Sequence, residues 1–179
     1  MLVTAHLGLA PWDVLHQGIS NHTGLSIGWV IVIVGLLLLL LWIPLRQRAG
    51  LGTILNALQI GLVVNVVVSR LPVTDLLIPR VLYVIGGLLV IGVGSGLYIG
   101  AGLGAGPRDG LMVGLSQRGV SVHLARTALE ITVLVAGVAL GGKVGFGTVA
   151  FTLAIGPIVH QTIPRMQMRE PEPALAIAH

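Results

Sequence analysis

Long apolar runs separated by short polar turns dominate this chain. A helix needs about 20 residues to cross the hydrocarbon core of a bilayer, and five runs reach or approach that length. The clearest of them contains the uninterrupted leucine block Leu36–Leu41. We therefore predict an all-α membrane protein with five transmembrane helices, at about residues 27–45, 51–71, 81–103, 122–140 and 146–163.

Two further segments are too short and too polar to cross a bilayer. They are Pro11–Asn21 and Pro107–Gly119, and each begins with proline and carries aspartate two residues later, at Asp13 and Asp109. Proline suits the first position of a helix, and an acidic residue in the first turn suits the helix dipole. We predict two short Pro-x-Asp helices that lie at the membrane surface or dip partly into it.

An internal repeat links the two halves of the chain. The heptapeptide LGLAPWD at 7–13 matches LGAGPRD at 103–109, and GLGT at 50–53 matches GFGT at 145–148. The repeat unit is therefore a helix, a Pro-x-Asp short helix, a second helix, a Gly-x-Gly-Thr turn and a third helix.

The repeat sets the predicted domain organisation. We expect one transmembrane domain over residues 1–163, with repeat 1 at about 1–71 and repeat 2 at about 80–163. The leading helix of repeat 1 should occupy about 20 residues before Ala5, but only four residues stand there. The sequence as given thus predicts that this helix is missing, which leaves five spans where six are expected.

Three spans in each unit require the second repeat to be inverted relative to the first, as in inverted-repeat transporters. The charges agree with this arrangement. If the turn with Arg46 and Arg48 is cytoplasmic, alternation places seven of the ten basic residues on that side and three outside, as the positive-inside rule favours. The charged, proline-rich tail at 164–179 is then cytoplasmic, and its composition predicts disorder.

Composition narrows the class of protein further. Charged residues make up 9% of the chain and hydrophobic residues 55%, whereas ordinary soluble domains carry about 25% charged residues. The net charge of +4 is spread over the ends of the predicted helices, without a basic cluster or an aromatic stacking platform. We therefore expect the lipid bilayer as a partner and no nucleic acid. Cysteine is absent, which excludes disulfides and thiolate chemistry.

The motifs also resemble a known family. The run from Leu7 to Ser20, the segment Thr23–Ser26 and the turn Gly50–Asn56 are similar to the bacterial YczE/YyaS/YitT-type integral membrane proteins, and Gly104–Leu111 fits the same pattern. The resemblance covers nearly the whole chain up to the tail. It implies a polytopic inner-membrane protein of poorly defined role and supplies no substrate.

Three acidic residues are candidates for coupling or ligand binding. Asp13 and Asp109 occupy equivalent places at the start of the two short helices, where they could bind a cation, take up protons or orient a ligand. The alternative is that each caps its own helix. Glu130 lies inside a predicted span, where carboxylates are costly and often functional, although Arg126, four residues earlier, could form an ion pair with it.

Other polar residues carry weaker signals. Asn56 and Gln59 share one face of the second predicted span, where they either line a polar path or make helix-to-helix hydrogen bonds. The histidine spacing fits no metal site, and we expect surface or interfacial positions for His16 and the other histidines. Tryptophans typically anchor helices at membrane interfaces, and we expect this of Trp12, Trp29 and Trp42.

A set of four glycines recurs at every fourth residue of the third predicted span. This small-xxx-small pattern predicts one smooth helix-packing face. The glycines are Gly92, Gly96, Gly100 and Gly104.

Two functions remain open from the sequence. The inverted repeat and the paired short helices favour a small secondary transporter or permease-like protein with a small-molecule or ion substrate. The alternative is a non-catalytic membrane scaffold or regulator that acts through helix–helix contacts at the glycine face. We expect no enzymatic activity and no cofactor, because no nucleophile, metal set or Walker motif stands out, and a homo-oligomeric state is compatible with either function.

Overall fold

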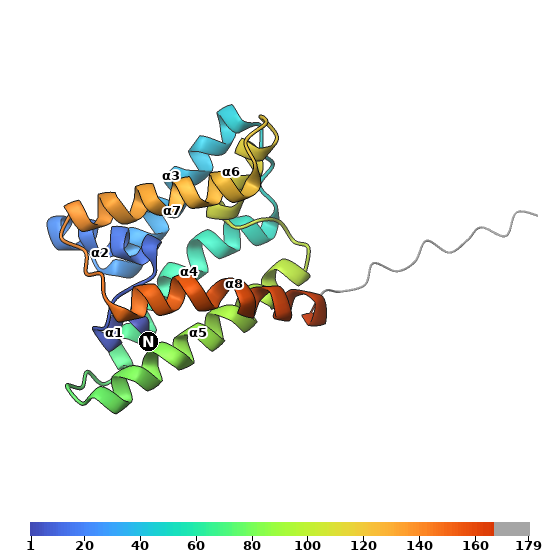
Figure 1. Ribbon diagram of the computed structural model, residues 1–179. Coiled ribbons are helices and arrows are strands. Elements are labelled where there is room, and N and C mark those ends of the chain that lie inside the picture. Colours follow the sequence, from blue (N-terminus) through green and yellow to red (C-terminus); the bar gives the residue numbers. More distant parts are fainter. Residues whose placement is uncertain (167–179) are drawn as a thin grey trace, which may run out of the picture.

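The computed structural model describes residues 1–166, apart from the side chains of Val122, His123 and Ile163. All eight elements in this part of the chain are helices (Figure 1). They are α1 (Leu2–Ala5), α2 (Pro11–Thr23), α3 (Ile27–Leu45), α4 (Leu51–Arg70), α5 (Leu77–Gly100), α6 (Pro107–Ser116), α7 (Val122–Ala139) and α8 (Phe146–Met166).

Four of these helices are long and apolar enough to cross a membrane. They are α3, α4, α5 and α8, with mean hydropathies between 2.7 and 1.3. The fifth predicted span, α7, forms as a helix but is not among the four, and its first half carries the polar pair Arg126 and Glu130. The prediction that α7 is a fifth membrane span therefore stays a prediction.

The predicted boundaries hold to within a few residues, with two differences. Helix α5 begins at Leu77 and includes Pro79, because a proline in the first turn removes an N–H group that has no partner within the helix. Helix α8 continues through Pro164 to Met166, so the expected tail does not begin at residue 164. Residues 167–179, where disorder is predicted, lie outside the described part.

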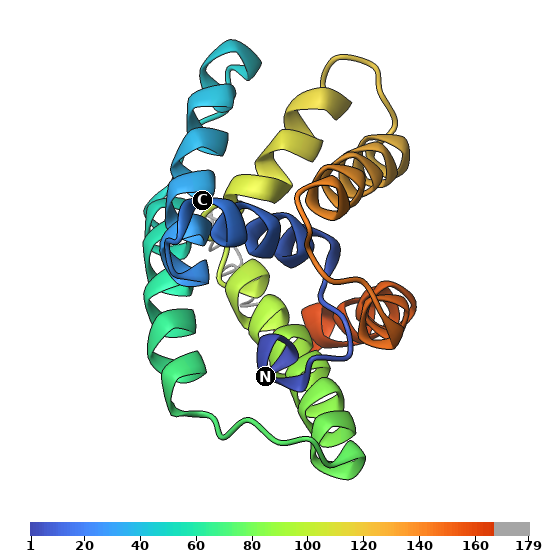
Figure 2. The same ribbon diagram turned by 90° about the vertical axis from the view of Figure 1, so that its left-hand side faces the viewer.

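The long helices pack as neighbours in pairs. Helix α5 lies along α8, α3 along α4, and α2 along α7, while α6 packs against α3 (Figures 1 and 2). Gly92 and Gly96 face α8, where a Cβ atom at either position would collide with Ile158 or Thr162. The Thr162 hydroxyl also donates a hydrogen bond to the Gly92 carbonyl oxygen at 2.9 Å.

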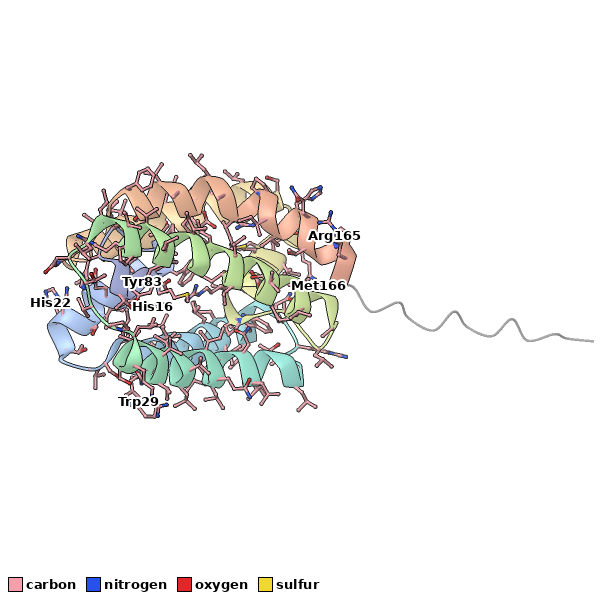
Figure 3. All side chains as sticks on the ribbon, turned by 90° about the horizontal axis from the view of Figure 1, so that it is seen from below. His16, His22, Trp29, Tyr83, Arg165 and Met166 are labelled. Atoms are coloured by element: carbon pink, nitrogen blue, oxygen red, sulfur yellow. The ribbon has the colours of Figure 1, made fainter. Side chains whose placement is uncertain are left out.

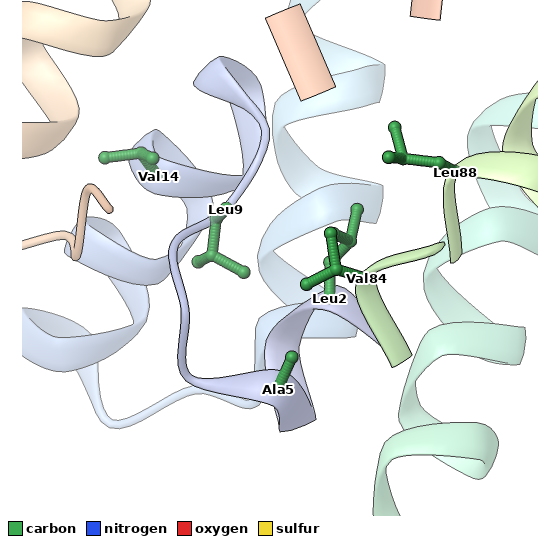
Figure 4. Packing of buried hydrophobic residues seen from close by; sticks show 6 residues of the cluster. All are labelled: Leu2, Ala5, Leu9, Val14, Val84 and Leu88. Carbon is green, nitrogen blue, oxygen red and sulfur yellow. The ribbon is translucent and has the colours of Figure 1, made fainter. Parts of the chain in front are cut away.

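A small apolar core holds the first residues in place. Leu2 and Ala5 of α1, Leu9, Val14 of α2, and Val84 and Leu88 of α5 form one buried cluster (Figure 4). Arg80 at the start of α5 strengthens this attachment, since its Nε and Nη2 donate hydrogen bonds to the carbonyl oxygens of Ala5 (2.6 Å) and His6 (2.7 Å). The extended segment that leads into α2 is thereby fixed against α5.

Large apolar side chains cover much of the outer surface. Leu40 of α3 is 59% exposed, and Leu153 of α8 is 71% exposed. An apolar surface this extensive would promote association in water, but it is the surface that a bilayer requires.

Candidate functional site

Two glycine-containing loops bring distant parts of the chain together. The first loop, residues 6–10, leads into α2 and packs on the start of α8, where the Gly147 N–H donates to the Leu7 carbonyl at 2.7 Å. The second loop, residues 101–106, leads into α6 and packs on the start of α4, where the Gly52 N–H donates to the Leu103 carbonyl at 3.1 Å. Each loop thus docks on the turn that the sequence comparison assigned to the other repeat.

Glycine is required where these loops approach the turns. Gly8 and Gly104 have φ angles of +110° and +119°, and residues with a Cβ atom rarely adopt such angles. A Cβ atom would also lie 2.8 Å from the hydroxyl oxygen of Thr148 at Gly8, and 2.8 Å from that of Thr53 at Gly104. Gly104 therefore contacts the start of α4 from a loop and does not extend the helical face of Gly92 and Gly96, because α5 ends at Gly100.

The docked loops direct the N-termini of α2 and α6 to one junction. Trp12 and Arg108 are the second residues of these two helices. The guanidinium carbon of Arg108 lies 4.9 Å from the centroid of the Trp12 ring, which is the geometry of a cation–π contact. Trp12 is buried, so its ring packs inside the protein, and its expected position near the membrane interface stays a prediction.

Asp13 completes this junction on the α2 side. Its Oδ1 lies 3.4 Å from Nδ1 of His16, which is 1% exposed and lies inside the molecule (Figure 3). The surface position expected for His16 is therefore wrong, because the residue faces the packed side of a short helix. We call Trp12, Asp13, His16 and Arg108 the junction cluster.

Burial and charge set the ionisation of the junction cluster, which lies outside the four candidate spans. Burial by itself raises the pKa of Asp13, but the hydrogen bond to His16 and the charge of Arg108 outweigh it, so the pKa of Asp13 lies below its ordinary value. Burial lowers the pKa of His16. Asp13 is thus the anionic member of the cluster at neutral pH, and His16 is the neutral one.

An Arg108→Gln variant should show increased sensitivity to acid. The ionised form of Asp13 stabilises the folded protein above its ordinary pKa, and this contribution is lost as the pH falls through the lower pKa of the folded state. Without Arg108 the folded-state pKa rises, so the acid limb of the stability curve should move to higher pH. Loss of the cation–π contact should also cost about 0.5 to 2 kcal/mol at neutral pH.

Thermal unfolding in detergent across acidic and neutral pH measures both effects. Arg70→Gln, at the exposed end of α4, is the control for the loss of a positive charge. An acid limb that shifts equally in the two variants would show that Arg108 does not act on Asp13.

Asp109 has a different environment from Asp13. Its Oδ2 accepts a hydrogen bond from the Tyr98 hydroxyl at 2.5 Å, and that hydroxyl in turn accepts one from the Gly106 N–H at 2.5 Å. An open recess of about 340 Å³ lies beside them. It is lined by Tyr98, Ile99, Gly102, Gly104, Ala105 and Asp109.

Neither aspartate caps its own helix. The Asp13 carboxylate pairs with His16 and the Asp109 carboxylate with Tyr98. Among the described residues, no hydrogen bond joins either carboxylate to the backbone of its helix. Both carboxylates therefore bind other side chains, and helix capping does not account for their positions.

The remaining sequence candidates lie apart from the junction cluster. Glu130 is paired with Arg126, whose Nε lies 3.0 Å from Oε1 of the carboxylate. Asn56 is half-buried and Gln59 is exposed, and neither amide makes a hydrogen bond to a described residue. A different amide on α4, that of Asn65, accepts the Gly28 N–H at 3.0 Å and joins α4 to α3.

Sequence reasoning missed the contacts that position α6. Trp42 of α3 is 3% exposed, and its Nε1 donates a hydrogen bond to the Pro107 carbonyl at 3.0 Å. The Trp42 ring therefore packs between α3 and α6, and its expected position near the membrane interface stays a prediction. Trp29, in contrast, is 50% exposed and lies at the periphery (Figure 3). One feature of the sequence could have indicated the contact between Trp12 and Arg108. The two residues occupy the same position of the repeat.

Comparison with known proteins places this architecture in a family. Residues 1–164 match the model of DUF6198, a family of unknown function. The chain belongs to this family. The matched range includes all the residues of the junction cluster and both docked loops.

Curated relatives of the family include two from Bacillus subtilis. An uncharacterized protein of Haemophilus influenzae is 43% identical over 160 residues, which cover 89% of this chain and 73% of that protein. The uncharacterized membrane protein YczE of Bacillus subtilis is 34% identical, with coverages of 89% and 75%. The uncharacterized protein YyaS of the same organism is 27% identical, with coverages of 92% and 84%. No solved structure matches the chain.

Proposed function

We propose that this membrane protein is a small secondary transporter or permease-like protein whose substrate passes the junction of α2 and α6. One observation carries the proposal: two short helices begin at a common junction and bring Trp12, Asp13 and Arg108 together there. In secondary transporters, discontinuous helices of this kind end at the substrate and ion sites.

The matched docking of the two loops supports an inverted repeat. The Gly50 N–H donates to the Thr53 hydroxyl at 3.2 Å, and the Gly145 N–H donates to the Thr148 hydroxyl at 3.3 Å. The short helix of each repeat also packs on a long helix of the other repeat: α2 packs on α7, and α6 packs on α3. We therefore propose that the segments at about residues 1–71 and 80–163 are inverted copies of one repeat, with α7 as a fifth span.

The charges of the junction suggest roles for its residues. Burial lowers the pKa of Arg108 below its ordinary value, and the charges of Asp13 and Asp109, from the two units, partly oppose this shift. We propose that the two carboxylates bind a coupling ion or a polar group of the substrate, and that Arg108 balances their charge. A bacterial inner-membrane location with the C-terminal tail in the cytoplasm belongs to the same proposal.

Uptake and efflux in reconstituted vesicles, measured across a panel of ions and small molecules, test this function. Asp13→Asn and Asp109→Asn should each reduce transport by about tenfold or more, which corresponds to about 1.4 kcal/mol in the barrier. Asp75→Asn, in the exposed segment between α4 and α5, should leave transport unchanged.

Two results would count against transport. One is a panel in which no compound moves, and the other is a transported compound whose rate is unaffected by both junction variants. A partner protein whose co-purification depended on the glycine face would favour the scaffold function instead. That face is covered by α8 at Gly92 and Gly96, so a scaffold would require α8 to move.

A further inference from the structure

An apolar groove of about 300 Å³ lies where the last turn of α3 meets α6 and α7. Leu41, which lines it, is 52% exposed on a candidate span, so the groove opens to the outer apolar surface. The lining consists entirely of aliphatic side chains and proline. These residues are Leu41, Pro44, Leu45, Leu111, Leu115 and Leu129.

Three arginines lie next to the segments that line this groove. Arg46 directly follows Leu45 at the end of α3. Arg118 donates hydrogen bonds from its guanidinium to the carbonyl oxygens of Pro44 and Leu45, so its charge lies at the end of the groove. Arg126 precedes Leu129 by three residues and therefore lies on the same side of α7. We call Arg46, Arg118 and Arg126 the arginine rim.

One acidic residue lies beside the arginine rim. The Nε of Arg126 donates a hydrogen bond to the Glu130 carboxylate at 3.0 Å, so Glu130 offsets one of the three positive charges of the rim. The rim therefore keeps a net positive charge next to an aliphatic groove. This combination complements a molecule that carries a negative head and a hydrocarbon chain.

We propose that the groove binds an acyl chain of an anionic phospholipid and that the arginine rim holds its headgroup phosphate. Guanidinium groups bind phosphate oxygens through paired hydrogen bonds, and basic pockets between transmembrane helices bind anionic headgroups. A zwitterionic lipid fills the groove equally well but gains less from the rim. The proposal uses none of the junction residues and does not depend on transport.

Native mass spectrometry of the delipidated full-length protein tests the site. Phosphatidylglycerol should bind more tightly than phosphatidylcholine with the same acyl chains. Arg126→Gln should weaken phosphatidylglycerol binding by about fivefold, as expected for one arginine near an anionic headgroup, and should leave phosphatidylcholine binding unchanged. Glu130→Gln should strengthen phosphatidylglycerol binding, because it removes the negative charge that offsets Arg126.

A second pair of variants tests the groove itself. Leu129→Trp fills the groove and should reduce the binding of both lipids, whereas Ile131→Trp places the same ring on an exposed part of α7 and should not. Thermal unfolding of each variant identifies any loss of folding, and Arg70→Gln controls for the loss of a positive charge elsewhere.

Three results would overturn the proposal. The first is equal binding of the two lipids by the wild type, and the second is equal behaviour of Leu129→Trp and Ile131→Trp. The third is displacement of phosphatidylglycerol by glycerol 3-phosphate at similar concentrations, which would identify a site for a soluble phosphate and not for a lipid.

Discussion

Gly50→Ala and Gly145→Ala will each destabilise the protein strongly, with roughly 3 kcal/mol from overpacking alone, the upper end of its usual range. A Cβ atom at Gly50 would collide with the Leu103 carbonyl oxygen, and one at Gly145 would collide with the Leu7 carbonyl oxygen. Both obstacles are backbone atoms, so no side-chain rotation can relieve the clash. The two variants should therefore behave alike, although the residues lie far apart in the sequence.

Each substitution also breaks the hydrogen bond that docks a loop. The same carbonyl oxygens accept the N–H groups of Gly52 and Gly147, and a buried polar group left without its partner adds about 1 to 3 kcal/mol. Thermal unfolding in a fixed detergent measures the loss. Gly156→Ala, in α8 with no atom within 4 Å of the new methyl group, is the control and should be nearly neutral. A large loss in one variant only would contradict the matched docking of the two loops.

Gly110→Ala will have the second large effect, because it forces two helices apart. A methyl group at Gly110 would overlap the indole ring of Trp42, which is almost completely buried and cannot rotate freely. Displacing the ring should break its hydrogen bond to the Pro107 carbonyl and shift the start of α6. We expect a destabilisation of about 2 to 3 kcal/mol and a displacement of Arg108, which moves with α6.

Tryptophan fluorescence and thermal unfolding report this displacement directly. Emission should shift to longer wavelength in Gly110→Ala as Trp42 becomes solvated. Gly94→Ala, in the middle of α5 with open space around the new methyl group, should change neither measurement. Unchanged emission together with unchanged stability in Gly110→Ala would show that α6 does not pack on Trp42 as described.

The sequence predicted the helices well because apolar length alone decides a span. The leucine-rich run and its flanking turn define α3 at residues 27–45 without help from tertiary contacts. The two Pro-x-Asp segments also form as short helices, at α2 and α6. The end of α5 was harder to predict, because Gly102 and Gly104 adopt positive φ angles within a run that is still apolar.

The candidate site was only partly predictable. Asp13 and Asp109 were identified because a carboxylate near a helix start is visible in a one-dimensional pattern. The roles of Tyr98 and Arg108 were not predicted, since these residues acquire their contacts from the way the helices meet. Trp12 and Trp42 were assigned to the membrane interface because an indole ring suits that environment, but the pattern did not show that both rings are buried at helix crossings.

The docking of each loop on a distant turn has a consequence for the order in which the protein folds during synthesis. The Leu7 carbonyl is synthesised before its partner and must wait for the Gly147 N–H, which lies far along the chain after it. An unpaired backbone group is costly in hydrocarbon, so the nascent first loop should remain in water or within the insertion machinery during this time. Insertion of the individual helices and closure of the finished fold are therefore separate events, and a ribosome that stalls before α8 leaves a chain that cannot complete either its first loop or its core.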